Sequence, residues 1–226
     1  MIWLYILVEG PTEENFVKLT LGPHLLNFSV HAIPIIVTFS RDPRTGEKAR
    51  GGGSWKRWVT DLHCLAGQHS RQDARFTTLF DFYGLPRDFP ERKAHLACAD
   101  TVQCVRSLEQ AMANIVEDRR FIPYLQRHEF EALVLACLDK LSELLDSADR
   151  PSVARLTRDL EGMGPEDVNG GEQTAPSKRL EKVLGYTKTL HGPFAIDAAG
   201  LVVIRSKCPG FDAWLTKLES LAGTTP

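Results

Sequence analysis

Short apolar runs alternate with amphipathic stretches along the first 126 residues of the chain. Four of the runs are rich in β-branched and aromatic residues, which is typical of strands buried on both faces of a sheet. These runs are Ile2–Val8 and residues 33–39, 75–84 and 121–126. Between these runs lie segments in which apolar residues recur at helical spacing. They are a segment that starts at Pro11 or Thr12, residues 55–65 and Thr101–Val116. This alternation predicts an α/β fold with a doubly wound parallel sheet of about four strands flanked by helices.

The second part of the chain is mostly helical in pattern. Apolar residues from Phe130 to Leu141 form one stripe with the spacing of a single packed helix. Turn-forming residues fill positions 163–177 and predict a long loop. Residues 180–186, 196–206 and 211–221 are expected to form closing helices. We therefore predict an α/β core over residues 1–142 and a helical C-terminal extension over residues 143–226 that packs on it.

Composition narrows the class of protein. The 226 residues are 43% hydrophobic and 25% charged, with a net charge of −2, which is ordinary for a globular protein. No general basic surface is present, so a nucleic-acid site must be a local patch. The first eight residues lack a basic segment and are too short an apolar run for a signal peptide or a membrane span. Five cysteines without a CxxC pair argue against a disulfide framework or a zinc ribbon, and we expect a cytoplasmic protein.

Carboxylates follow two of the predicted strands directly. Glu9 ends the first strand, Glu13 lies four residues further on, and Asp81 lies near the end of the third. The carboxyl ends of parallel strands meet at one edge of a sheet, where ligands bind. Converging carboxylates repel one another unless a cation neutralises them, and their hard oxygen atoms select Mg²⁺ or Mn²⁺. The alternative is that Glu9 stabilises the following helix through its dipole and Asp81 forms a turn.

The segment HEFEA brings three more polar residues to the same edge. His128, Glu129 and Glu131 follow the fourth predicted strand. We expect Glu129 or Glu131 to join the acidic cluster, with His128 as a proton shuttle or a phosphate contact. Alternatively, the two glutamates are first-turn carboxylates favoured by the helix dipole and His128 is a capping residue.

Basic residues supply candidates for binding a phosphate backbone. A glycine-rich loop after the second strand has a local surplus of Lys and Arg, and further basic residues occur near the C-terminus. The alternative is that they form solvated faces. The loop lacks the GxxxxGK[ST] pattern of a nucleotide-binding P-loop. The candidates are Arg50, Lys56, Arg57, Lys178, Arg179, Lys188, Arg205 and Lys207.

Four motifs occur in order along nearly the whole chain: EGPTE, LFDFYGLP, RFIPYLQRHEFEALV and VVIRSKCPGFDAW. Together they resemble a bacterial Toprim-like family of unknown function, akin to RloB-like and AbiL-type abortive-infection proteins and to OLD-family nucleases. The resemblance implies that Glu9 is an acid/base or a metal ligand and that Glu13 has the spacing of a second glutamate. Asp81 matches the first aspartate of the Toprim DxD motif, whereas Tyr83 replaces the second. It also implies a downstream lysine near the scissile phosphate, for which the candidates are Lys178 and Lys207.

The sequence thus predicts a nuclease that depends on Mg²⁺ or Mn²⁺ and hydrolyses DNA or RNA. The resemblance implies an effector of an anti-phage or abortive-infection system that works with an AAA or ABC-type ATPase. Catalysis is assigned to Glu9, Asp81, His128 and Lys178, and metal binding to Glu9, Glu13, Asp81, Glu129 and Glu131. The alternative is a degenerate, non-catalytic domain, with Tyr83 in place of the ligand, that binds the ATPase as a partner or scaffold. Nucleotidyl transfer is a third, weaker hypothesis.

Overall fold

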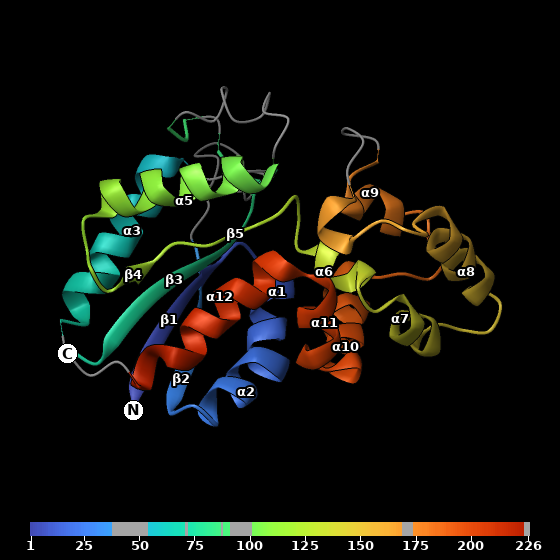
Figure 1. Cartoon of the computed structure of the whole chain (residues 1–226), viewed down its shortest axis with the longest axis horizontal. Helices are drawn as coiled ribbons and strands as arrows, with labels where there is room; N and C mark the ends of the chain where they lie inside the picture. The colour runs from blue at the N-terminus through green and yellow to red at the C-terminus, as the bar shows by residue number, and fades with distance from the viewer. Residues whose placement is uncertain (38–53, 71, 87, 91–100, 169–173, 224–226) are drawn as a thin grey trace, which may run out of the picture.

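The computed structural model describes residues 1–37, 54–70, 72–86, 88–90, 101–168 and 174–223. A parallel sheet lies at its centre, with the strand order β2-β1-β3-β4, and β5 continues the β4 edge by pairing with β3 (Figure 1). The strands are β1 (Ile2–Val8), β2 (Val30–Ile36), β3 (Ala74–Asp81), β4 (Phe121–Ile122) and β5 (Leu125–Gln126). The predicted α/β class, with a sheet of about four strands and a mostly helical C-terminal part, is confirmed.

Three strand predictions change in detail. The third strand ends at Asp81 and not at residue 84. The second strand begins at Val30 and not at residue 33, because its register aligns Val30 with Ile2 and Ile36 with Val8. Residues 38 and 39 of the prediction lie outside the described residues. The fourth strand is split at Pro123, which has no N–H to donate to the sheet. Thr78 bridges the break: its Oγ1 accepts the Tyr124 N–H at 3.0 Å and donates to the Tyr124 carbonyl at 2.7 Å.

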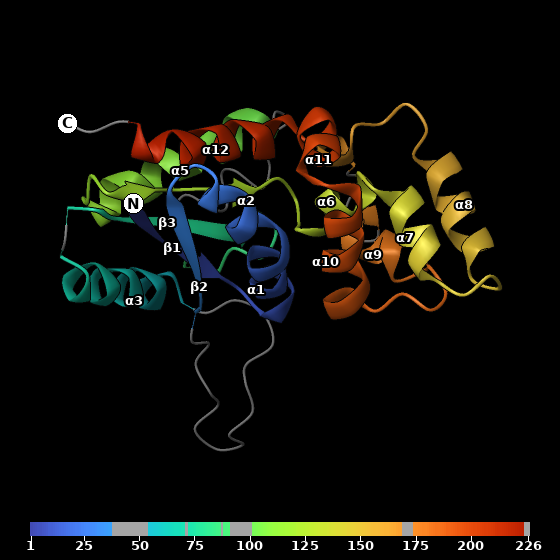
Figure 2. The same ribbon diagram turned by 90° about the horizontal axis from the view of Figure 1, so that it is seen from below.

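Both faces of the sheet are covered, as the near-continuous apolar strands require. Leu4, Ile6 and Val8 pack on one face and Tyr5 and Leu7 on the other. In Figures 1 and 2 the N-terminal helices and α12 lie on the opposite side of the sheet from α3 and α5. The covering helices are α1 (Pro11–Phe16), the π-helix η1 (Val17–Leu21), α2 (Gly22–Leu26), α3 (Trp55–Gln68), α5 (Thr101–Val116) and α12 (Pro209–Glu219).

The other helices form the right-hand part of Figure 1, beyond the sheet. They are short and separated by turns. They are α6 (Glu131–Leu135), α7 (Leu138–Leu144), α8 (Arg150–Asp159), α9 (Pro176–Leu180), α10 (Lys188–Ala199) and α11 (Leu201–Lys207), with the 3₁₀ turn η2 (Pro165–Asp167). The 3₁₀ turn η4 (Ser220–Ala222) instead follows α12.

Three helix predictions need correction. The stripe from Phe130 to Leu141 is two helices, because Cys137 has a non-helical backbone between α6 and α7. The predicted helix 196–206 is divided by Gly200, whose φ of 77° suits glycine but breaks a helix. The predicted helix 180–186 lies earlier, as α9, and turns follow it. The predicted loop 163–177 contains η2.

The C-terminal helix α12 packs directly on the sheet. The Trp214 indole stacks on Tyr124 with ring centroids 4.4 Å apart, and its Nε1–H donates to Thr77 Oγ1 at 2.9 Å. One apolar core accordingly includes residues from β1 to η4. The division of the chain at residue 142 stays a prediction.

Two further sequence expectations meet the structure here. Cys104 is disulfide-bonded, whereas Cys64, Cys137 and Cys208 are free thiols. Among the described residues, every helix is too short or too polar to span a bilayer.

Candidate functional site

Glu9 lies at the carboxyl end of β1 and is tied to β3. Its Oε1 accepts the backbone N–H of Asp81 at 2.8 Å. The following turn leaves space for this carboxylate only because residue 84 is glycine. A Cβ at Gly84 would stand 3.0 Å from Glu9 Oε2 and 3.2 Å from the Asp81 Cβ, closer than side-chain atoms normally approach.

Asp81, the last residue of β3, links this pair to the segment after β5. Its Oδ1 accepts the backbone N–H of Phe130 at 2.7 Å. Phe130 immediately precedes α6, so the bond holds the first turn of α6 against the strand edge. This places Glu131 beside Asp81 and Glu9, and the charge on Glu131 raises the pKa of both.

Glu131 is 1% exposed and forms an ion pair with Lys188 Nζ at 2.7 Å. Lys188 is the first residue of α10, and its side chain is 46% exposed. Because α10 packs against both α1 and α6, it brings the ammonium group to the acidic edge (Figure 2). Glu131 Oε2 is buried without a hydrogen-bond partner in the described part of the chain.

Glu13 comes from the first turn of α1 and is 5% exposed. We call Glu9, Glu13, Asp81, Glu131 and Lys188 the acidic edge. Burial raises the pKa of Glu9 to about 7 and that of Glu13 to about 6, and in both cases the neighbouring carboxylates add to the rise. Burial also raises the pKa of Asp81 well above its ordinary value, reinforced by Glu9, Glu13 and Glu131.

Lys188 responds in the opposite sense. Burial lowers the pKa of its ammonium group, but the charges of Glu131, Asp81 and Glu13 outweigh this and raise the pKa above its ordinary value. The acidic edge therefore holds four carboxylates and one ammonium group, which stays charged at neutral pH. Negative charge is in excess, and protons or a further cation must neutralise it.

The donor set fits a hard divalent cation in its chemistry. All four acids supply carboxylate oxygens, the ligands that Mg²⁺ and Mn²⁺ prefer. One oxygen each of Glu9 and Asp81 is held by a backbone N–H, and Glu131 Oε2 is an orphaned buried acceptor. Among the described residues, however, no three His, Cys, Asp or Glu side chains stand ready at ligand spacing. Binding would therefore require the side chains to draw together.

The other residues of HEFEA point elsewhere. Glu129 binds Ser177, accepting its backbone N–H at 2.8 Å and its hydroxyl at 3.0 Å at the start of α9. His128 is 1% exposed with φ of 63°, and its ring lies 5.1 Å from that of Tyr83. Burial and the charge of Arg127 lower the pKa of His128 to about 4, so its imidazole is neutral at pH 7. Glu131, and not Glu129, is thus the HEFEA carboxylate at the acidic edge.

The predicted phosphate-binding residues are scattered over several elements. Arg50 lies outside the described residues. On α3, Lys56 is exposed and Arg57 pairs with Asp61 at 3.0 Å. On α9, Lys178 pairs with Glu181 at 2.8 Å and Arg179 donates to the Thr174 carbonyl at 2.8 Å.

The two basic residues of α11 are engaged within the protein. Arg205 forms ion pairs with Asp212 and Glu219, and Lys207 donates to the Ala136 carbonyl at 2.7 Å. Neither lysine taken as the downstream lysine, Lys178 or Lys207, pairs with the acidic edge; Lys188 does.

Sequence reasoning gave Lys188 no special place among the basic residues, because nothing in its local pattern reveals that α10 begins beside Glu131. Sequence reasoning also missed Gly84, although this glycine is part of the LFDFYGLP motif. Tyr186 was missed as well. Its hydroxyl is buried without a partner among the described residues, and burial together with the charge of Glu131 raises its pKa.

Comparison with known proteins places the chain in a family. It superposes on the C-terminal region of the Burkholderia pseudomallei OLD protein with a TM-score of 0.44 and 11% identity, over 97% of this chain and 98% of that one. For the C-terminal region of the Xanthomonas campestris pv. campestris OLD protein the TM-score is 0.41 and the identity 14%, over 98% of both chains. Both TM-scores lie below 0.5, so neither likeness supports an argument about the site. No curated protein matches the sequence. The profile of one family matches residues 8–219, nearly the whole chain, and the protein therefore belongs to the family described as Domain of unknown function (DUF4276).

Proposed function

We propose that the protein is a phosphodiester hydrolase that acts on nucleic acid and uses Mg²⁺ or Mn²⁺ at the acidic edge. The observation that carries this proposal is the meeting of Glu9, Glu13, Asp81 and Glu131 at the carboxyl ends of parallel strands, with a single lysine among them. Four carboxylates that are largely removed from water repel one another. This repulsion lowers the stability of the folded protein unless a bound cation offsets it.

Glu9, Glu13, Asp81 and Glu131 would hold the cation. When bound, it would polarise the phosphodiester and lower the pKa of an attacking water. The protein's own residues supply orientation and proton transfer. The bonds from the Asp81 and Phe130 N–H groups fix one oxygen of Glu9 and one of Asp81, so that each carboxylate is held in place with a second oxygen that these bonds do not use. In the metal-free edge the pKa of Glu9 is about 7, and Glu9 is our candidate for the group that accepts and returns a proton.

Lys188 is suited to the role of the downstream lysine. Its ammonium group remains charged, and it is half-exposed beside the carboxylates. A cation that neutralises Glu131 would release Lys188 to contact a non-bridging phosphate oxygen. Lys56, Arg57, Lys178 and Arg179, with Arg50, are proposed to bind the phosphate backbone further from the reacting bond. His128, neutral and buried, is better placed to position Tyr83 than to shuttle protons.

The resemblance of the motifs to Toprim-like abortive-infection proteins and OLD nucleases supports a finer proposal. The protein would act in the cytoplasm as an effector of an anti-phage system together with an ATPase. The cleavage experiment described below distinguishes DNA from RNA as the substrate.

A non-catalytic role as a partner for such an ATPase is the second candidate. It is favoured by the lack of ready ligand spacing among the described acids and by the ion pair through which Lys188 already neutralises Glu131. In that case Lys188 is a permanent counter-ion and no divalent cation binds.

Calorimetric titration of Mg²⁺ and Mn²⁺ separates the two candidates. We expect saturable binding by the wild-type protein and none by the double variant Glu9→Gln, Asp81→Asn. The matched control is Glu129→Gln, which removes a carboxylate of the same segment that is bound to Ser177. Cleavage of single- and double-stranded DNA and RNA is then measured in Mn²⁺. Absence of metal binding in the wild-type protein, or binding that the double variant retains, would refute the hydrolase proposal and favour the scaffold.

A further inference from the structure

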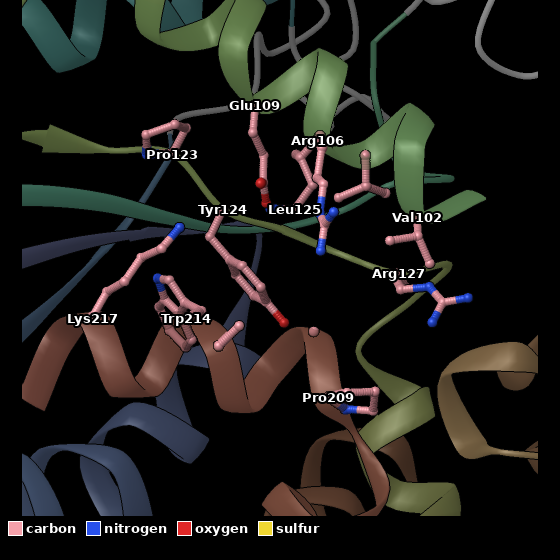
Figure 3. Close-up of a pocket in the computed structure, with 13 residues that line it drawn as sticks. Val102, Arg106, Glu109, Pro123, Tyr124, Leu125, Arg127, Pro209, Trp214 and Lys217 are labelled. Carbon is pink, nitrogen blue, oxygen red and sulfur yellow. The ribbon is translucent and has the colours of Figure 1, made fainter. Parts of the chain in front are cut away.

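A second polar site lies on the far edge of the sheet, between α5 and α12 and over the β4–β5 segment (Figure 3). It is a pocket of about 360 Å³, within the roughly 300–1,000 Å³ typical of small-molecule sites. It shares no lining residue with the acidic edge. We call it the α5–α12 pocket.

Two cations face this space from opposite walls. Figure 3 shows Arg106 directed from α5 and Lys217 directed from α12 toward the same volume. Neither the Arg106 guanidinium nor the Lys217 ammonium group makes a hydrogen bond or an ion pair within the described part of the chain, in contrast to Arg57 and Arg205 elsewhere. Two uncompensated cations across one cavity favour a ligand with a concentrated negative charge.

Arg127 adds a donor at one end of the pocket. Its residue is 9% exposed, and its charge is balanced by Asp167 at 2.7 Å and, more distantly, by Glu166 at 3.9 Å. Its Nε–H is nevertheless buried without an acceptor among the described residues. A buried guanidinium N–H without a partner is costly, and an anionic oxygen entering the pocket would satisfy it.

The pocket also contains one acid, Glu109, whose Oε1 accepts the Leu125 N–H at 3.0 Å. Burial raises the pKa of Glu109 to about 7, although the Leu125 N–H, Lys217 and Arg106 all act to lower it. Figure 3 shows the Glu109 side chain directed from α5 into the pocket. A wholly apolar ligand would leave this carboxyl group unpaired, whereas a ring carrying N–H or N atoms would bind it whether or not it is protonated.

The remaining walls are apolar. They include Val102, Val105, Pro123, Ala213 and the ring of Trp214. The polar atoms of the two aromatic residues are already bound inside the protein, Trp214 Nε1 to Thr77 and the Tyr124 hydroxyl to Gln126. These walls therefore select a ligand body by shape and apolar contact, not by hydrogen bonds from Trp214 or Tyr124.

We propose that the α5–α12 pocket binds a phosphomonoester joined to a planar nitrogen heterocycle, with the size and chemistry of a nucleoside monophosphate. The phosphate, with a charge of about −1.5 to −2 at pH 7, lies between Arg106 and Lys217. The ring packs against Pro123 and Trp214 and hydrogen-bonds to Glu109. This site is separate from the acidic edge and does not depend on the function proposed for it.

Isothermal titration of AMP, CMP, GMP and UMP in EDTA tests the proposal, because the chelator prevents metal-mediated binding at the acidic edge. We expect at least one of the four nucleotides to bind saturably. The nucleoside that corresponds to that nucleotide, which lacks the phosphate, should bind more weakly, and so should ribose 5-phosphate, which lacks the ring. The variant Arg106→Gln, Lys217→Gln should weaken binding by roughly tenfold or more, since two charge-assisted contacts are lost. Both side chains are exposed at their ends, and an unchanged melting temperature verifies the fold.

The matched control is Arg155→Gln, Arg158→Gln, which removes the same charge from exposed positions of α8 and should bind normally. The Glu9→Gln, Asp81→Asn variant should also bind normally, which separates this outcome from that of the hydrolase test. No saturable binding by any of the four nucleotides, or equal binding by the Arg106→Gln, Lys217→Gln variant, would overturn the proposal. Equal affinity for ribose 5-phosphate would overturn the assignment of the ring.

Discussion

The acidic edge lies at the carboxyl ends of β1 and β3, the α5–α12 pocket lies over the β4–β5 segment, and the two polar sites have opposite charge balance. The first has four carboxylates around one lysine, and the second has two free cations and the Arg127 guanidinium around one carboxyl group. Each contains a partly buried glutamate whose pKa is raised to about 7, Glu9 in one and Glu109 in the other. Burial dominates both shifts, but neighbouring acids add to the first and neighbouring cations oppose the second.

That difference teaches what each site needs. At the acidic edge the charges of the protein repel one another, so a positive ligand relieves the site. In the pocket the charges that lack partners are positive, so a negative ligand relieves it. The same raised glutamate pKa therefore has opposite consequences for binding. The predictions below test this contrast.

The largest effect is expected at Lys188. In Lys188→Met the acidic edge loses the ammonium group that pairs with Glu131, so we expect tighter binding of Mn²⁺ than in the wild-type protein. Cleavage should nevertheless fall by about 10²–10³-fold, because the group that contacts the phosphate is gone. The two readouts move in opposite directions only if Lys188 is a phosphate contact; a cleavage rate that stays at the wild-type level would contradict that role. Lys140→Met is the control, because Lys140 lies on α7 and pairs with Glu143 at 2.7 Å.

A smaller but structural effect is expected at Gly84. In Gly84→Ala the new Cβ meets the Glu9 carboxylate and the Asp81 Cβ at 3.0–3.2 Å, so one of them must move. We expect a loss of about 1–3 kcal/mol in the free energy of unfolding and weaker Mn²⁺ binding.

Gly67→Ala is the matched control for this change. Gly67 lies near the end of α3, and nothing stands within 4 Å of its added Cβ. It should leave metal binding unchanged and stabilise the helix by about 0.5–1 kcal/mol, as alanine does at exposed helical positions. Chemical denaturation measures both. Equal stability of the two variants would show that Gly84 does not shape the acidic edge.

Local sequence patterns predict part of the acidic edge and almost nothing of the α5–α12 pocket, and this difference has a physical reason. The position of Glu9 and Asp81 at one edge follows from strand order and apolar runs, which are local patterns. Lys188 joins them only because α10 packs against α1 and α6, a contact between segments far apart in the chain. No local pattern encodes such a contact, so the sequence indicates Lys188 only as one of several scattered basic residues.

The α5–α12 pocket has even less local signal. Arg106 and Glu109 read as the polar face of an amphipathic helix, and Lys217 as that of another. They form a site only because α12 returns from the end of the chain to the sheet through Trp214 and Thr77. The helix breaks at Cys137 and Gly200 escaped prediction for the related reason that apolar spacing continues across both.

The pH dependence of stability should reveal the repulsion at the acidic edge. The Glu9 carboxyl has an ordinary pKa of 4.5 and a folded pKa of about 7, so between these values the folded protein binds more protons. This stabilisation is fully present below pH 4.5 and is lost as the pH rises through 7. His128, with its folded pKa lowered to about 4, acts in the opposite sense.

Comparison with Glu9→Gln cancels the His128 contribution, because both proteins retain that residue. Without metal, the variant should gain stability relative to the wild-type protein between pH 5 and pH 8, on the order of 2 kcal/mol. Saturating Mn²⁺ should reverse this difference at pH 8 by stabilising only the wild-type protein. Urea denaturation at each pH gives the values. A difference independent of pH would mean that Glu9 is ionised throughout and the edge is already neutralised.

The smallest effect is expected at Glu109, where removing the negative charge should strengthen the binding of an anionic ligand. Above pH 7 the Glu109 carboxylate lies among Arg106, Lys217 and Arg127 and offsets part of their attraction for a phosphate. Glu109→Gln should therefore bind a nucleoside monophosphate several-fold more tightly than the wild-type protein at pH 8. At pH 6 the wild-type carboxyl group is mostly protonated, so the two affinities should converge. Comparison at each pH cancels the titration of the phosphate itself. Weaker binding by the variant at both values would mean that the carboxylate is required as an acceptor, and that the pocket selects its ligand through the ring more than through the phosphate.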